Sequence, residues 1–270
     1  MTVNRAPSRV VSGLPTYTPD NPPVFRGGIT SGGAAYSPAD EFTGGKKGWL
    51  FDGSAGKSAF LQSAGGAVAG DGDPLGSVED LSGNGNHIVQ ATSGVKPVCR
   101  IDNGIRSIKI TSGKAIETTL VAPMPVTRTE VFVLFRAGSG PNEAYGPYTH
   151  STTFDATMFR YSRVEVLDGS VYKGFMPCGY TVPKIYVKKK ITSGGGSGLF
   201  IWEYSMAGAV LNSATLAYSS TDAQTGLGIG FNGYAMPNFW IPFSLGIEGD
   251  VDVAELIAYL VAGFGAWSSS

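Results

Sequence analysis

The chain has 270 residues, of which 42% are hydrophobic and only 15% charged, and its formal net charge is −1. That composition excludes a disordered chain, and a near-neutral surface gives no field to attract nucleic acid or an anionic membrane, so we expect neither partner. The 39 glycines and 16 prolines break helices, and together with abundant β-branched and aromatic residues they favour short strands joined by tight turns.

Residues 1–40 are expected to form an extended, Pro/Gly-rich arm, because this stretch has too little apolar surface to offset the entropy of folding alone. Apolar residues are nevertheless spaced along it, and they predict docking on a neighbouring subunit. The alternative is a tail without a partner. The expected docking residues are Val10, Val11, Leu14, Tyr17, Val24, Phe25 and Tyr36.

Strand-like runs begin after residue 41. Residues 48–51 form a first aromatic strand, and residues 98–111 predict a hairpin. Its turn is Asn103-Gly104, a pair suited to a type I′ turn because both central residues there need positive φ. Residues 131–135 are continuously apolar, as in a strand buried on both faces.

The second half continues the same rhythm and shows no internal repeat. Residues 158–166 alternate as one strand before a turn at Asp168-Gly169. Further strands are expected at residues 184–191, 199–204, 210–218, 227–231, 240–245 and 253–260. No helical period exceeds one or two turns, so two antiparallel sheets packed face to face fit the pattern best.

Four short motifs follow one another in a characteristic order: FLQSAGG at 60–66, GDPLG at 72–76, DLSGNGNH at 80–87 and QAT at 90–92. This order resembles the laminin-G-like, concanavalin A-like domains of bacteriophage structural proteins, and residues 247–259 resemble their last strand. The resemblance implies a concanavalin A-like jelly-roll β-sandwich at residues 41–270. It also implies a place in a virion, as a capsid decoration, collar or tail-fibre subunit.

The loop at residues 82–86 is dense in Gly and Asn, which tolerate left-handed backbone. We expect a tight loop whose Asn side chains bond their own backbone. His87 is expected to bond a backbone group at the base of this loop, and a ligand contact is its alternative role.

Asp250, Asp252 and Glu255 form a D-x-D-x-x-E pattern. On a strand, Asp250 and Asp252 would share one face, about 6.5–7 Å apart, which leaves a glycoside hydrolase as a remote alternative. The same two aspartates, or a loop with Asp71 and Asp73, are candidate calcium ligands, although no further acidic cluster completes a shell. We expect no cofactor and no enzymatic activity.

Other catalytic motifs are absent from the sequence. Residues 53–58 superficially resemble a phosphate-binding loop but lack the required spacing, and two histidines are too few for a usual zinc site. Residues 188–190, three consecutive lysines, are expected to be a solvated strand end, with acidic-glycan or subunit binding as an alternative. Cys99 and Cys178 form no disulfide framework.

Aromatic residues near Gly/Pro/Asn-rich segments could stack on sugars or fill the core. The candidate glycan contacts are Tyr145, Tyr148, Tyr234 and Trp240. The leading hypothesis is a virion component that acts through protein–protein contacts, as an oligomer and perhaps a trimer. A lectin-like module of a phage adhesion device is the alternative. No secretion signal is visible, and residues 256–267 are too short to span a bilayer, so we expect assembly in the host cytoplasm.

Overall fold

The structure is a computed structural model that describes residues 36–265 and 267 with internal gaps. The gaps are residues 112, 137–143, 150–154, 161–162, 169–170, 179–181, 192–197, 217–222 and 231–238. Of the expected docking residues of the arm, all but Tyr36 lie outside the described part, and so does Tyr234. The docking of the arm on a neighbour therefore stays a prediction.

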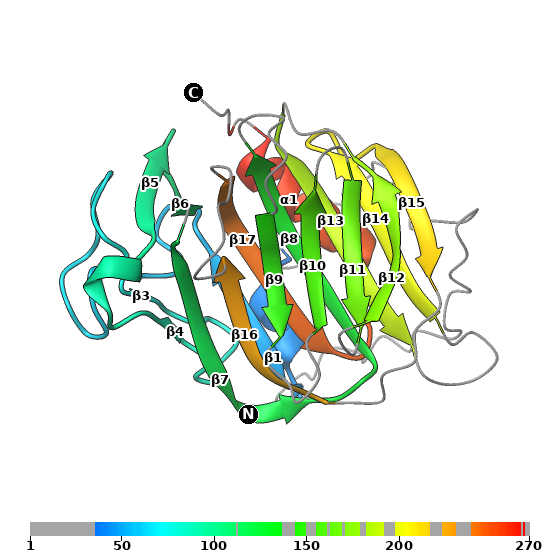
Figure 1. Ribbon diagram of the computed structural model, residues 1–270, viewed down its shortest axis with the longest axis horizontal. Coiled ribbons are helices and arrows are strands. Elements are labelled where there is room, and N and C mark those ends of the chain that lie inside the picture. The colour runs from blue at the N-terminus through cyan, green and yellow to red at the C-terminus, as the bar shows by residue number, and fades with distance from the viewer. Residues whose placement is uncertain are drawn as a thin grey trace, which may run out of the picture.

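The described strands form two antiparallel sheets, which confirms the predicted β-sandwich (Figure 1). The eight-stranded sheet has the order β15 (Val210–Leu216), β14 (Gly198–Ser205), β13 (Lys184–Ile191), β8 (Arg128–Arg136), β17 (Phe239–Glu248), β6 (Ile105–Ile110) and β5 (Val98–Asp102), with β1 (Gly48–Asp52) also paired to β17. The nine-stranded sheet has the order β12 (Val171–Pro177), β11 (Arg163–Asp168), β10 (Asp155–Arg160), β9 (Ala144–Thr149), β16 (Gln224–Gly230), β7 (Ala115–Met124), β4 (Ile88–Val89), β3 (Ser77–Val78) and β2 (Phe60–Leu61).

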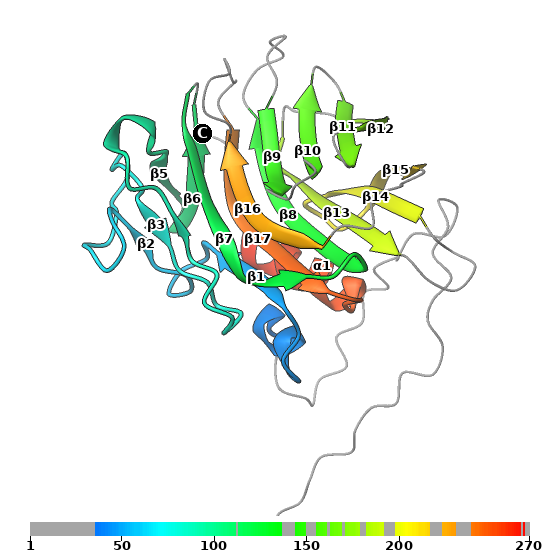
Figure 2. The same ribbon diagram turned by 60° about the horizontal axis from the view of Figure 1, so that its bottom comes forward.

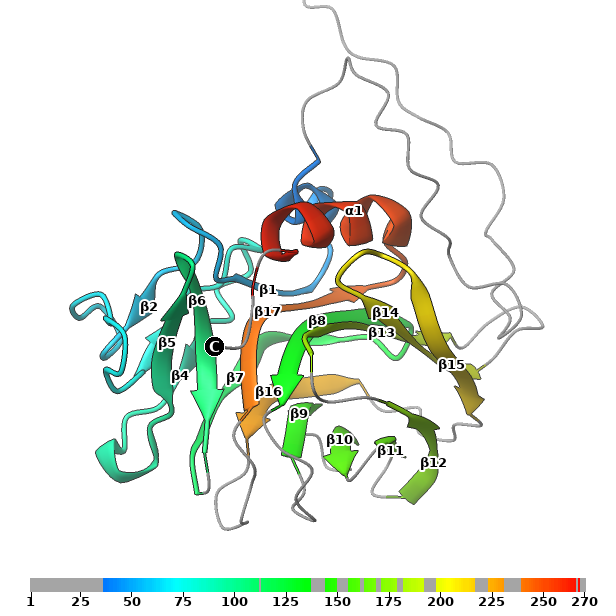
Figure 3. The same ribbon diagram turned by 90° about the horizontal axis from the view of Figure 1, so that it is seen from above.

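Alternation along each strand divides the apolar side chains between two cores. In β8, Phe132 and Leu134 point into the space between the sheets, while Val131 and Val133 point to the opposite face. Figure 3 shows that α1 (Val253–Phe264) covers this opposite face of the eight-stranded sheet, with β9 to β12 on the far side. The continuous apolar run at residues 131–135 is therefore buried on both faces, as predicted.

The expectation of a strand at residues 253–260 is wrong, because α1 occupies this stretch. Its buried residues recur at helical spacing: Val253, Leu256, Ile257, Leu260 and Phe264. Asp252 caps the first turn by accepting a hydrogen bond from the Glu255 backbone N–H at 3.1 Å. An apolar run that looks like a buried strand thus forms the amphipathic helix over the second core. None of the described helices is long and apolar enough to cross a membrane.

The predicted hairpin at residues 98–111 is confirmed as β5 and β6, with φ of 49° at Asn103 and 80° at Gly104. In contrast, residues 158–166 are not one strand. The chain reverses between β10 and β11, where Arg160 pairs with Arg163 across the ladder. The alternating pattern continues through this reversal, so periodicity could not reveal it.

The expectation that the Asn side chains of the loop at residues 82–86 bond their own backbone is wrong, because they bond the backbone of other segments. The Asn86 amide donates to the Gly48 carbonyl at 2.7 Å, and its side-chain oxygen accepts from the Val121 N–H at 2.8 Å. Because Gly48 is in β1 and Val121 in β7, this side chain joins the two sheets. Asp80 supports the loop by accepting from the Leu50 N–H at 2.8 Å. His87 Nδ1 accepts from the Asp80 N–H at 3.0 Å, which confirms its predicted backbone bond.

Residues 36–40, which we assigned to the arm, pack on the chain's own body. The 3-10 helix η1 (Pro38–Phe42) lies near β1 and α1 (Figures 2 and 3), and Phe42 is buried. The Tyr36 ring makes an edge contact with Tyr259 of α1, at 6.2 Å between centroids. Tyr36 therefore contacts its own helix. A second 3-10 helix, η2 (Ser93–Val95), precedes β5.

Candidate ligand-binding site

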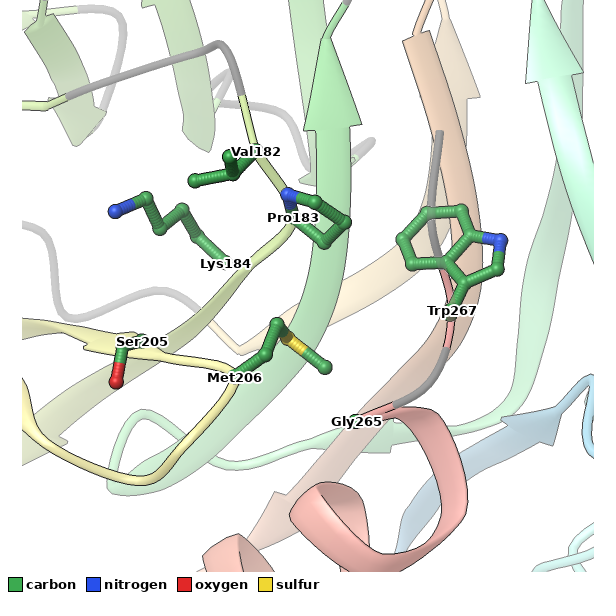
Figure 4. Close-up of a pocket in the computed structure, with 7 residues that line it drawn as sticks. All are labelled: Val182, Pro183, Lys184, Ser205, Met206, Gly265 and Trp267. Atoms are coloured by element: carbon green, nitrogen blue, oxygen red, sulfur yellow. The ribbon is translucent and has the colours of Figure 1, made fainter. Parts of the chain in front are cut away.

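A shallow pocket of about 290 Å³ lies where β13 begins, where the β14–β15 hairpin turns and where α1 ends (Figure 4). Its lining residues are Val182, Pro183, Lys184, Ser205, Met206, Gly265 and Trp267. Figure 4 shows the Trp267 indole on one side, Val182 and Pro183 on the other, and Met206 below. The hollow is therefore mainly apolar, with polar groups at its margin.

Local chain geometry places the aromatic wall. The helix ends at Phe264, and the Trp267 N–H then bonds the Phe264 carbonyl at 2.9 Å. A Cβ at Gly265 would approach the Val261 carbonyl oxygen to 2.5 Å, so glycine is required here. Phe135 holds the indole in a T-shaped contact at 6.4 Å. Sequence reasoning missed Trp267 because it placed a strand where α1 lies.

The hairpin turn that carries Met206 is fixed by its own hydrogen bonds. The Ser205 hydroxyl oxygen accepts from the N–H groups of Ala207 and Ala209, at 3.3 and 3.1 Å. Gly208 takes the positive φ of 79° that the turn needs. The turn therefore presents Met206 to the pocket from a backbone that is already hydrogen-bonded.

The positive charge at the pocket is largely neutralised by a buried acid. Lys184 Nζ lies 3.6 Å from Glu203 Oε1, and the Glu203 side chain is only 1% exposed. Burial raises the pKa of the Glu203 carboxyl, while Lys184 opposes that shift. Among its described lining residues, the pocket thus offers apolar surface and a paired cation, which suits an uncharged group with an apolar face.

The three candidate glycan contacts that lie in described strands are divided between the two sheets. Trp240 is in β17 of the eight-stranded sheet, whereas Tyr145 and Tyr148 are in β9 of the other sheet. Cross-strand neighbours flank the Trp240 ring: Phe135 at 4.9 Å from one side and the Lys109 ammonium at 5.5 Å from the other. Trp240 is half-buried, and its role as a glycan contact stays a prediction.

The candidate calcium ligands are engaged in protein contacts. Asp250 forms an ion pair with Lys189 and accepts from the Val251 N–H, while Asp252 caps α1. No group of three or more His, Cys, Asp or Glu side chains in the described residues could hold a metal ion. Asp250 and Asp252 lie between the end of β17 and the start of α1, so the strand face that we expected them to share is wrong.

The Asp71/Asp73 loop is also internally satisfied. Asp71 pairs with Arg100 at 2.7 Å and accepts from the Ile101 N–H at 2.8 Å. Asp73 accepts from the Gly70 N–H and from the Gln62 amide, both at 2.8 Å. These carboxylates tie the loop to its neighbours.

The prediction that residues 188–190 form a solvated strand end is wrong, because all three lysines are at most 4% exposed. Lys188 pairs with Glu130 at 2.6 Å, and Arg128 binds the same carboxylate at 3.0 Å. Both cysteines are buried, and neither is in a disulfide. The run of three lysines in the sequence does not reveal this ion pair, because Glu130 lies on another strand, β8.

No family model matches the sequence, and no curated protein matches it. Solved structures match by shape, with identities of 9–12%. The receptor-binding domain of botulinum neurotoxin type G matches with a TM-score of 0.51, covering 71% of this chain and 51% of that one. The serotype D ligand-binding domain in complex with N-acetylneuraminic acid matches at 0.53, covering 77% and 52%. The type DC binding domain in complex with rat synaptotagmin II also matches at 0.53, covering 76% and 51%.

The chain shares their β-sandwich fold. It spans about half the length of these structures, and at such low identity the likeness establishes the fold alone. The bacteriophage resemblance of the motifs is not supported by these matches. The ligands of the matched domains therefore enter only as a basis for a proposal.

Proposed function

We propose that the chain is a lectin-like module that binds a surface glycan through the pocket at the end of α1. The observation that carries this proposal is the fold shared with receptor-binding domains, one of them solved in complex with N-acetylneuraminic acid. The pocket offers a sugar ring the aliphatic side chains of Val182, Pro183 and Met206 and the small exposed part of the Trp267 indole, with a hydroxyl and an ammonium at the margin.

An array of bacterial and animal surface glycans tests the proposal, with Trp267→Ala and Met206→Ala as pocket variants. We expect each to weaken binding at least tenfold, about 1.4 kcal/mol. Val121→Ala is the matched control, because Val121 is exposed and lies on the other sheet. Met206 is less buried than Trp267, so it serves as the second variant if Trp267→Ala unfolds. Absence of any glycan binding by the wild type, or full binding by both variants, contradicts the proposal.

The second candidate function is a structural component of a bacteriophage virion, with no catalytic activity. The order of motifs in residues 60–92 favours it. In this case the chain is assembled in the host cytoplasm, and the segment before Tyr36 binds a capsid, collar or tail protein. The two functions are compatible in a tail-fibre adhesin.

Deletion of residues 1–34 tests the second candidate, because it spares Tyr36 and η1, which pack on the body. We expect the shortened chain to fold and melt like the full chain but to be absent from purified particles. Normal incorporation of the shortened chain would refute the docking role.

A further inference from the structure

The two sheets differ in what covers their outer faces. The eight-stranded sheet has α1 and η1 over it, whereas no described helix covers the outer face of the nine-stranded sheet (Figure 3). Phe175 of β12 is on this second face and is 48% exposed. It is the one aromatic residue among the exposed large hydrophobic side chains of the described part.

Phe175 has a cationic partner on the neighbouring strand. The Arg163 guanidinium carbon lies 5.1 Å from the centroid of the Phe175 ring. Register explains the contact, since β11 pairs Arg163 with Pro177 and Glu165 with Phe175, which puts Arg163 diagonally across from the ring. The core-facing neighbours on these strands are Val164 and Met176, so the Arg–Phe pair is on the opposite, outward side.

A buried carboxylate holds the arginine in this position. Arg163 Nε lies 2.5 Å from Glu165 Oε1; the Glu165 side chain is 2% exposed and that of Arg163 is 38% exposed. This pairing uses Nε, and because the Arg163 side chain is still 38% exposed, part of its guanidinium is accessible beside the ring. The result is an arginine paired with a buried carboxylate beside a half-exposed phenyl ring.

Such a pair matches one ligand chemistry well. A guanidinium binds a carboxylate through two parallel N–H···O bonds, and an aromatic ring contacts the C–H face of a sugar. We infer that Arg163 and Phe175 form a second glycan contact, specific for a carboxylated sugar residue. Its acid binds the Nη groups and its ring lies against Phe175. This inference rests on the glycan-binding function proposed above but uses a different surface from the pocket.

The probes are multivalent conjugates that end in sialic acid or glucuronic acid, each compared with the same conjugate after reduction of its carboxylate to an alcohol. Binding is measured by biolayer interferometry on the full chain. We expect the acidic conjugates to bind at least tenfold more tightly than their reduced forms. Arg163→Ala and Phe175→Ala should each abolish this preference.

Arg163→Lys keeps the charge but not the paired donors, so it should retain less than a tenth of the wild-type preference. Val121→Ala, an exposed apolar residue on β7 of the same sheet, is the control and should bind like the wild type. Removing Arg163 takes away a partner of the buried Glu165 and can weaken the fold. Phe175→Ala keeps that ion pair, so it tests the site even in that case.

The outcomes separate this inference from the proposed function. Equal binding of acidic and reduced conjugates, or unchanged preference in Phe175→Ala, overturns the acidic subsite while leaving binding at the pocket intact. No binding of any conjugate by the wild type overturns both.

Discussion

Lys189 is a buried lysine whose charge is compensated by an aspartate at the surface. Burial lowers the pKa of its ammonium, and Asp250 opposes that shift. Asp250 is 31% exposed, so the cost of losing it is smaller than for a fully buried pair. We expect Asp250→Ala to lower the free energy of unfolding by about 1–2 kcal/mol.

Lys189→Met is the matched variant, because it removes the buried charge and keeps an apolar side chain of similar length. The double variant should recover most of the stability lost in Asp250→Ala, as urea unfolding would measure. A double variant less stable than Asp250→Ala would show that the pair itself stabilises the fold.

The ionisation of Glu130 makes the stability of the fold depend on pH. Burial opposes its ionisation, but Lys188 and Arg128 outweigh this, so the pKa of the carboxyl is lowered. Because the folded state then binds fewer protons, the stabilisation is present above the unfolded pKa of about 4.3 and is lost as pH falls through the folded value.

Glu130→Gln should therefore lower the free energy of unfolding at pH 7 by about 3 kcal/mol and flatten its decline below pH 5. Urea unfolding from pH 7 to 3 measures both effects. The exposed Glu79→Gln is the control. A decline in Glu130→Gln as steep as in the wild type would rule out this carboxylate as a cause of acid sensitivity. The raised pKa of Glu203 has the opposite effect on stability as pH falls. The contribution of Glu130 is therefore read from the difference between Glu130→Gln and the wild type.

At the scale of elements, the start of α1 depends on one side chain. Asp252→Ala removes the N-cap acceptor and should destabilise the protein by about 1 kcal/mol, seen as a lower midpoint in urea. Asp252→Asn keeps a capping oxygen and should stay within about 0.3 kcal/mol of the wild type. If both variants lost the same amount of stability, the charge of Asp252, and not its capping oxygen, would be the cause.

The loop at residues 82–86 also depends on one side chain, because Asn86 joins the two sheets. Asn86→Ala removes the bonds to the Gly48 carbonyl and to the Val121 N–H, which together join the two sheets, although the Gly48 carbonyl keeps the Asn84 amide as a donor. We expect a loss of about 2–3 kcal/mol in urea unfolding. Asn84→Ala, at a less buried position of the same loop, should cost less. The reverse order would show that the loop, and not the cross-sheet bond, matters.

Most strands could be predicted from alternation, and the hairpin from Asn103-Gly104, because local chemistry determines both. The helix could not be separated from a strand by its apolar content, although Asp252 with Glu255 three residues later was a visible capping signal. The pocket was unpredictable for a different reason. Its walls come from three segments that meet only after β13, the β14–β15 turn and α1 have packed.

For the whole molecule, the described part is a sandwich with unequal sides: helices cover the outer face of one sheet, and no described helix covers the other. The proposed pocket is on the helix-covered side, and Arg163 with Phe175 is on the other side, so both sheets separate the two sites. A single copy would then be divalent. Beads coated with a glycan bearing both kinds of sugar should be drawn into aggregates by this monomer alone, with no need for self-association.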